Sequence, residues 1–345
     1  MGRMKNLNFL LLYIKMIGKR SGFAILFFVV FARVAGAQTG TTLKFGTLAP
    51  SGSAWVDAMM KFKQSVESQT KVKVVIYSGG VLGDESEMVR KLKEGKIQGG
   101  AFIVKAMKEI APELDFLDVP FLFESYDEVR YIYENMRSDF EQLIDRNGFV
   151  LAEMSHHGFV KFFSVKPIRS FYELKNMRTW AWHGEPMIAN FLNLLEVKPI
   201  FVEVTELLNA LSNGLVETFQ TTPLGCLSMQ WCKIAKYVLD YNYRYEPGIV
   251  VISKGFFSSL SKNERDIIIS EVRKTAKEIN TQIERIQKEA ESKLVQMGFT
   301  FSKPSPSEIS ELKDKVQQMI KNKIKGYEYY SKVIRLLEAY RKKKN

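Results

Sequence analysis

The sequence predicts an α/β protein of two lobes, with a cleft between them and one long helix packed across both. Short apolar segments typical of strands alternate with helical segments from Leu43 onward, and this alternation restarts near Phe149. No segment rich in proline or serine separates the two blocks, which predicts lobes joined by crossing strands. Apolar residues at helical spacing continue for about 35 residues after Ser261. The alternation favours an α/β class with a largely parallel sheet.

The first block predicts two strand–helix–strand units. The expected elements are a strand at 43–48, a helix at 54–68, a strand at 72–77, a helix at about 84–93 and a short strand near 98–103. In such sheets ligands bind beyond the carboxyl ends of the strands. This places the loops 50–55 and 78–87 near the cleft.

The second block repeats the pattern with shorter elements. Strands are expected near 149–154, 162–165, 178–182, 197–202, 215–220 and 249–252, and helices at 185–195 and 205–212. A capping box, Ser261 to Glu264, opens the long helix, and a second box, Ser305 to Glu308, opens another. A third helix is expected from Ile324 to Ala339, followed by a solvated basic tail, Arg341 to Lys344.

The two cysteines, Cys226 and Cys232, lie in a segment with a helical pattern. Six residues along a helix separate them by about 9 Å of rise and roughly 240° of rotation. A disulfide needs Cα atoms within about 7 Å. We therefore expect two free, buried thiols.

The N-terminal segment, residues 1–37, predicts a secretory signal peptide cleaved after Ala37. It holds six basic residues and no acidic one, and the apolar run 23–31 precedes Ala35-Gly-Ala37. That run is too short to span a bilayer, although an uncleaved anchor is the alternative. A second apolar run before Met16 leaves open a start at either Met1 or Met16. The expected location is the periplasm.

Charge and motifs exclude several classes of function. Removal of the six basic residues from the total of 50 leaves 44 against 38 acidic residues, and no basic surface interleaved with aromatics is evident, so no nucleic-acid partner is expected. Common catalytic and nucleotide-binding motifs are missing, which argues against an enzyme. His156 and His157 point to opposite faces of a strand, so no metal site and no cofactor are predicted.

Arg178 is the most informative single residue. It follows a short helical pattern and opens an apolar run with Trp180 and Trp182, which predicts a buried strand. A guanidinium there is costly unless an anion meets it, and its fork of donors suits a carboxylate. The alternative is a residue at a strand end, paired with a glutamate.

Five other residues are candidates for ligand contact, each with a structural alternative. Trp180 and Trp182 share a strand face and could line the cleft or pack in the core, and the same holds for Trp55. Gln220 could bind a ligand or merely end a strand. Glu85 follows a glycine turn, where a helix start already explains an acid.

From Leu43 to about Gly298 the chain resembles the substrate-binding subunits of tripartite ATP-independent periplasmic (TRAP) transporters. The motifs that carry the resemblance are Gly46 to Pro50 with Trp55, Gly79 to Met88, Pro120 to Phe123, Lys166 to Ile168 with Glu173 to Lys175, Met177-Arg178, Pro199-Ile200, and Ala210 to Glu217. The resemblance implies a two-domain periplasmic binding protein fold with an interlobe cleft and a long domain-spanning helix. It assigns 41–157 with about 247–285 to lobe I, 158–246 with about 286–320 to lobe II, and 321–345 to a basic C-terminal helix and tail.

The resemblance also implies a function, in which Arg178 pairs with a ligand carboxylate and membrane permease subunits receive the ligand. Several positions depart from the family pattern. Thr179 to Trp182 stands where many members have Val-Pro after the arginine. Val160 and Lys161 stand where acid-sugar binders often have an arginine, and Glu217 to Thr221 replaces a more polar run. These changes favour a small organic acid with one carboxylate and an apolar body. The alternative is an envelope interaction module of the same fold that docks to a helical-repeat periplasmic protein.

Overall fold

The computed structural model describes residues 41–321, 324 and 326–344. Within this part, seven strands form one mixed sheet in the order β2-β1-β3-β8-β4-β7, with β9 paired to β8. The first three strands, β1 (Thr42–Gly46), β2 (Lys73–Tyr77) and β3 (Gly99–Phe102), are parallel, as predicted. Helices α2 (Ala54–Gln69) and α3 (Glu85–Lys93) connect them. The side chain of Ser53 caps α2 by accepting a hydrogen bond from the amide of Val56.

The parallel arrangement predicted for the first block does not continue into the centre of the sheet. Strand β8 (Tyr237–Ser253) runs antiparallel to both β3 and β4 (Phe149–Ser164), and β4 runs antiparallel to β7 (Thr218–Thr221). The strands predicted separately at 149–154 and 162–165 are parts of the single strand β4. Register shifts on either side of Gly158 let this strand bend without ending. Two long antiparallel strands therefore join the two blocks.

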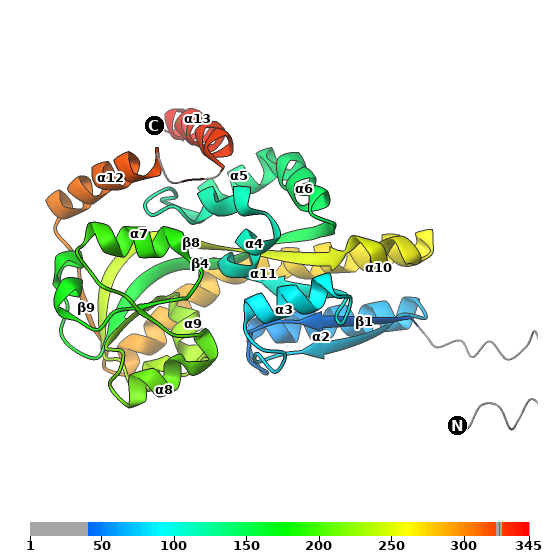
Figure 1. Cartoon of the computed structure of the whole chain (residues 1–345), viewed down its shortest axis with the longest axis horizontal. Helices are drawn as coiled ribbons and strands as arrows, with labels where there is room; N and C mark the ends of the chain where they lie inside the picture. Colours follow the sequence, from blue (N-terminus) through cyan, green and yellow to red (C-terminus); the bar gives the residue numbers. More distant parts are fainter. Residues whose placement is uncertain (1–40, 322–323, 325, 345) are drawn as a thin grey trace, which may run out of the picture. The chain divides into compact units, whose positions relative to one another are not determined.

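The predicted long helix is confirmed as α11 (Lys262–Gln296), and its capping box is complete. It packs against α2 of the first block, against β4, and against α9 (Pro223–Ser228) of the second block. Figure 1 shows α11 passing behind β4 and β8. Asn280 and Gln287 hold the bend of β4, since Asn280 bonds the backbone at Met154 and His156 and Gln287 donates to the carbonyl of His157 at 2.6 Å. The helix therefore braces the bend between the blocks.

The helices between β3 and β4 cover one side of the sheet. These are α4 (Val104–Ile110), the 3₁₀ helix η2 (Pro112–Asp118), α5 (Tyr126–Asn135) and α6 (Arg137–Arg146). In the second block, β5 (Trp180–Ala181) and β6 (Ile200–Phe201) form a small parallel sheet. The helices of the second block are η3 (Phe171–Asn176), α7 (Pro186–Leu194), η4 (Val204–Glu206), α8 (Leu207–Ser212), α9 and η5 (Trp231–Lys233). The residues from Thr41 onward cluster as one compact unit, and the predicted lobe boundaries stay a prediction.

The expectation of free thiols is wrong, because Cys226 and Cys232 form a disulfide with Cα atoms 5.3 Å apart. The predicted continuous helix does not exist at this point. Helix α9 ends at Ser228, and Gln230 adopts a left-handed conformation with φ 63° before η5 begins. The chain therefore turns back and brings the two sulfur atoms together.

The C-terminal helices tie the ends of the molecule to its centre. Ser305 caps α12 (Pro306–Ile320) as predicted, but the carboxylate of Glu308 accepts from Ser170 and Phe171 and does not close a capping box. Helix α13 (Tyr327–Lys344) lies beside α5 in Figure 1. Lys342 to Lys344 of the tail are exposed, as expected, while Arg341 is half-buried and binds Glu128, and Lys344 also pairs with Asp127. These pairs fix α13 through its last turn.

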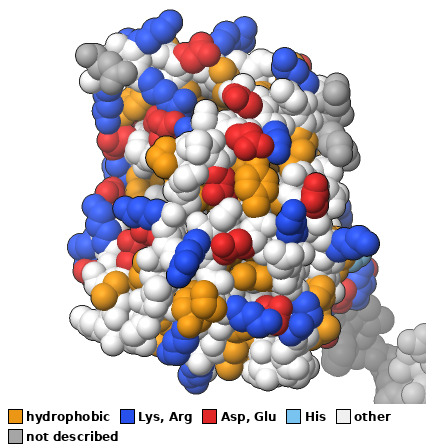
Figure 2. Space-filling view, turned by 90° about the vertical axis from the view of Figure 1, so that its left-hand side faces the viewer, with side chains coloured by type: hydrophobic (Ala, Val, Ile, Leu, Met, Phe, Trp, Pro, Cys, Tyr) orange, Lys and Arg blue, Asp and Glu red, His pale blue; other side chains and the backbone are white. Residues whose placement is uncertain are grey.

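On the face drawn in Figure 2, basic and acidic side chains are interspersed and apolar ones appear as small separate spots. None of the helices in residues 41–321 and 326–344 has both the length and the apolarity needed to cross a bilayer. The predicted signal peptide, residues 1–37, lies outside the described residues.

Candidate functional site

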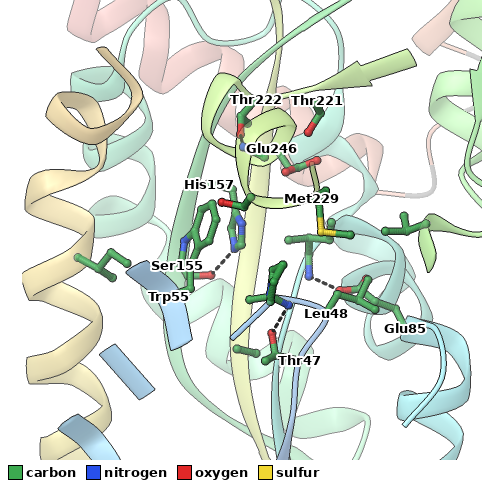
Figure 3. Close-up of a pocket in the computed structure, with 18 of the residues that line it drawn as sticks. Thr47, Leu48, Trp55, Glu85, Ser155, His157, Thr221, Thr222, Met229 and Glu246 are labelled. Atoms are coloured by element: carbon green, nitrogen blue, oxygen red, sulfur yellow. Dashed lines mark hydrogen bonds between the residues drawn. The ribbon is translucent and has the colours of Figure 1, made fainter. Parts of the chain in front are cut away.

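A cavity of about 160 Å³ lies where the two blocks meet. Its walls come from the loop after β1, from α2, β4, β7, β8 and α11, and from the segments around β5 and α9. Figure 3 shows this region, with side chains from both blocks drawn around it. Because these segments lie far apart in the sequence, only the folded sheet and α11 bring them together.

Aromatic side chains form much of the wall. Trp55, in the first turn of α2, stacks on His157 of β4 with ring centres 5.1 Å apart. Trp180 meets Trp231 edge to face at 5.9 Å, and its indole nitrogen donates to the carbonyl of Val202. Burial lowers the pKa of His157 to about 4, so this ring is neutral at ordinary pH. The wall is therefore uncharged and mainly apolar.

One end of the cavity is polar and centres on Arg244 of β8, which is 3% exposed. Its guanidinium pairs with the fully buried Asp118, and one of its terminal nitrogens lies 3.4 Å from the side-chain oxygen of Gln220. Tyr243 also donates to that oxygen. Asp118 in turn accepts from Lys108 at 2.8 Å. This network holds the guanidinium in one place.

Three glutamates also line the cavity, and burial raises the pKa of each. The pKa is about 8 for Glu85, about 7 for Glu185 and about 7 for Glu246. Glu85 has an evident structural role, since its carboxylate accepts from the amides of Ile103 and Ala106 at the start of α4. Within the described residues, no backbone amide donates to the carboxyl group of Glu185 or Glu246.

Several buried polar atoms of the lining lack a hydrogen-bond partner among the described residues. They are Nε1 of Trp55, Nε2 of Gln220, Nε of Arg244 and Oε1 of Glu185. Leaving a buried polar group unpaired costs about 1–3 kcal/mol. Three of the four atoms are donors, so a bound molecule that offers acceptor oxygens would offset part of this cost.

Beside the cavity, an ionic cluster joins the two blocks. Lys105 of α4 pairs with Asp84, which precedes α3, and with Glu203, which follows β6. The indole of Trp182 donates to Glu203 at 2.7 Å and to Asp84 at 3.2 Å. Burial raises the pKa of Asp84 to about 6. The cluster therefore ties the first block to the second next to a tryptophan of the cavity wall.

Five of the six predicted site residues line this cavity: Trp55, Glu85, Trp180, Trp182 and Gln220. Their contact with a ligand stays a prediction. Arg178 is elsewhere, because its side chain is 50% exposed and bonds to Glu217 and to the carbonyl of Gly214, each at 2.8 Å. The expected dry location of this guanidinium is therefore wrong. Its contacts are those of the alternative, a strand-end residue paired with a glutamate.

Arg244, Glu185 and Glu246 were not predicted from the sequence. The signal for Arg244 was present, since this arginine stands between Tyr243 and Tyr245 in a segment rich in tyrosine. The criterion applied to Arg178, a cation inside an apolar and aromatic run, fits Arg244 equally well. No comparable signal marks Glu185, which precedes a proline at the start of α7.

Comparison with known proteins gives a consistent result. The family model of the bacterial extracellular solute-binding proteins, family 7, matches residues 45–326. The sialic acid-binding periplasmic protein of Vibrio cholerae is 23% identical over 248 residues, which cover 70% of this chain and 76% of that protein.

Solved structures show the same fold. The sugar acid-binding protein of Advenella mimigardefordensis in complex with galactonate has a TM-score of 0.81 and 19% identity, covering 86% of this chain and 98% of that one. A TRAP periplasmic solute-binding protein of Haemophilus influenzae with bound L-gulonate has a TM-score of 0.80 and 19% identity, covering 87% and 99%.

Proposed function

Because this chain belongs to family 7 of the bacterial extracellular solute-binding proteins, as a substrate-binding subunit of a TRAP transporter, we propose that its cavity captures a small organic acid with an apolar body. The family is extracytoplasmic and not enzymatic, and it works with membrane permease subunits. In this proposal the chain reaches the periplasm by a cleavable signal peptide and delivers its ligand to such a permease.

The proposal rests on one observation. The cavity has an apolar wall, and at one end it has hydrogen-bond donors without partners. Gln220 and Arg244 each keep one buried N–H group without a partner among the described residues. A carboxylate accepts from both side-chain types, and charge-assisted hydrogen bonds to a guanidinium are among the stronger ones in proteins. The acid group therefore belongs at this end and the carbon skeleton against the tryptophans.

The size and lining of the cavity limit the carbon skeleton. An apolar cavity of about 150 Å³ engineered into another protein binds benzene. This cavity is of similar volume, about 160 Å³, and is lined by Trp55, Trp180 and Trp231. A branched or aromatic skeleton of about six carbons would fill it and exclude water.

Ligand capture would work by a shift between open and closed forms. A ligand that contacts Trp55 of the first block and Trp180 of the second favours the closed form by its extra affinity for that form. The cluster of Lys105, Asp84 and Glu203 joins the same two blocks beside the cavity. We infer that closure completes both sets of contacts together. The comparisons do not support the alternative of a helical-repeat partner.

Two arginine variants test directly whether Arg244 binds the ligand carboxylate. Arg244→Lys keeps a positive charge near Asp118 but removes the fork of donors, and we expect at least about tenfold weaker binding of the tightest acid. Arg178→Ala is the matched control, and its affinity should stay within about twofold of the wild type. Calorimetric titration gives both values, and circular dichroism shows whether each variant is folded.

The reverse result would contradict the assignment. If Arg178→Ala lost the affinity and Arg244→Lys kept it, the role predicted from the sequence for Arg178 would stand. Gln220→Glu is a second probe that hardly alters size, since it replaces the unpartnered N–H group with an oxygen. It should weaken the binding of a carboxylate, and unchanged affinity would count against this end of the cavity.

A further inference from the structure

In the buried region at and behind the polar end of the cavity, acidic groups outnumber basic ones. Lys108 lies 2.9 Å from Asp115 and 2.8 Å from Asp118, and Arg244 also pairs with Asp118. These two cations and two aspartates balance one another. Glu185 and Glu246 add two further carboxyl groups to the same buried region. This region therefore holds two more acidic groups than basic ones.

Glu185 forms no ion pair among the described residues, and Glu246 forms only a long one, which it shares with Asp118. Glu185 is 3% exposed, and its Oε1 atom has no hydrogen-bond partner. The partner of Glu246 is a terminal nitrogen of Arg244, 3.9 Å away, and this guanidinium is already paired with Asp118. Glu246 is among the labelled side chains in Figure 3. A buried carboxylate is stable only when it is paired with a cation or protonated. Each of the two glutamates therefore either binds a further cation or keeps its proton.

We infer that the ligand carries an amine beside its carboxylate, so that it is a zwitterion with an apolar side chain whose ammonium group pairs with Glu185 and Glu246. The inference rests on the proposed function and specifies the ligand class of the same cavity. The carboxylate would occupy the unpartnered donors of Arg244 and Gln220. An acid without the amine would satisfy the donors and leave both glutamates without a cation.

The affinities for a zwitterion and for a plain carboxylate should depend on pH in opposite ways. Glu185 faces Arg244, Asp118, Lys108 and Glu246, and burial sets the pKa of both glutamates near 7. Above that pH the glutamates are ionised and attract an ammonium group, so a zwitterion binds more tightly as pH rises from about 6 to about 8. A plain carboxylate is repelled by the same ionised glutamates and binds more weakly over this range.

The test is a calorimetric titration of the whole exported chain with two matched series. The leucine series comprises leucine, 2-hydroxy-4-methylpentanoate, 4-methyl-2-oxopentanoate and 4-methylpentanoate, and the phenylalanine series its four counterparts. We expect the amino acid of at least one series to bind at least about tenfold more tightly than its oxo and unsubstituted acids, with affinity that rises with pH.

Glu185→Gln and Glu246→Gln provide the matched variants. Each should reduce the preference for the amino acid over the oxo acid by at least about fivefold without weakening the oxo acid, a pattern that a folding defect would not produce. Binding of the oxo or unsubstituted acids as tight as that of the amino acids overturns the inference and leaves the proposed function standing. If no acid of either series binds, both are overturned.

Discussion

Arg178 and Arg244 show how the same residue type acquires different surroundings in one fold. Arg178 stands two residues before Trp180, and Arg244 stands between two tyrosines. Arg178 lies at the edge of the small second-block sheet, where Gly214 and Glu217 reach it and solvent covers half of it. Arg244 lies on β8, and both neighbouring tyrosines are at most 1% exposed. Arg244 is buried because β8 pairs with strands on both sides. The local sequence pattern does not reveal this pairing.

The unusual protonation of Glu185 leads to a prediction about stability. Burial favours its neutral form, with a pKa of about 7 in the folded chain against an ordinary value of 4.5. Folding therefore disfavours the ionised carboxylate, and this cost grows as pH rises from about 4.5 to about 7. Glu185→Gln, which mimics the neutral acid, should raise the free energy of unfolding of the ligand-free protein at pH 8 by on the order of 2 kcal/mol.

The same variant should match the wild type near pH 4, where Glu185 is neutral in the folded chain and mostly protonated in the unfolded chain. Urea unfolding followed by circular dichroism at the two pH values measures the difference. A variant less stable than the wild type at pH 8 would show that Glu185 is ionised and well paired in the folded chain. A gain in stability together with a loss of ligand preference would be typical of a binding residue.

The segment from Cys226 to Cys232 is the element where sequence reasoning failed most clearly. The helical pattern is real through Ser228, but the left-handed residue Gln230 reverses the chain. Such a reversal at a residue other than glycine has no dependable signal in the sequence. Its consequence is functional, because Met229 and Trp231, which line the cavity, lie inside the loop that the disulfide closes.

Removing this disulfide should affect both stability and binding. For a loop of this length the chain-entropy model predicts a loss of about 2 kcal/mol in the double variant Cys226→Ser, Cys232→Ser. We also expect weaker ligand binding at temperatures where the variant is fully folded, because Met229 and Trp231 are no longer held in place. Thermal unfolding and calorimetry give the two quantities separately. Unchanged affinity in the folded variant would show that the rest of the wall fixes this loop.

At the scale of the molecule, much of the fold could be predicted because it rests on local patterns. The alternation of strands and helices indicated the class, and the capping box with its apolar repeat located α11 within one or two residues. The central antiparallel strands were missed because their pairing depends on contacts between segments about 90 residues apart, such as His156 with Pro247.

The site was predictable in part for the same reason. Loops after parallel strands meet at one edge of a sheet, which brought Trp55 and Glu85 into the prediction. The polar end was not predictable, since Asp118, Glu185 and Arg244 come from three distant segments. Only the crossing of β8 through the centre of the sheet places them together.

The proposed function requires a cavity that prefers an apolar acid with a single carboxylate. The most direct test is calorimetric titration of the wild-type protein with a panel of acids matched in carbon number: branched and aromatic acids with one carboxylate, dicarboxylates such as succinate, and sugar acids. We predict that an acid with one carboxylate and an apolar body binds most tightly. Tighter binding of a dicarboxylate or a sugar acid than of every such acid would contradict the account.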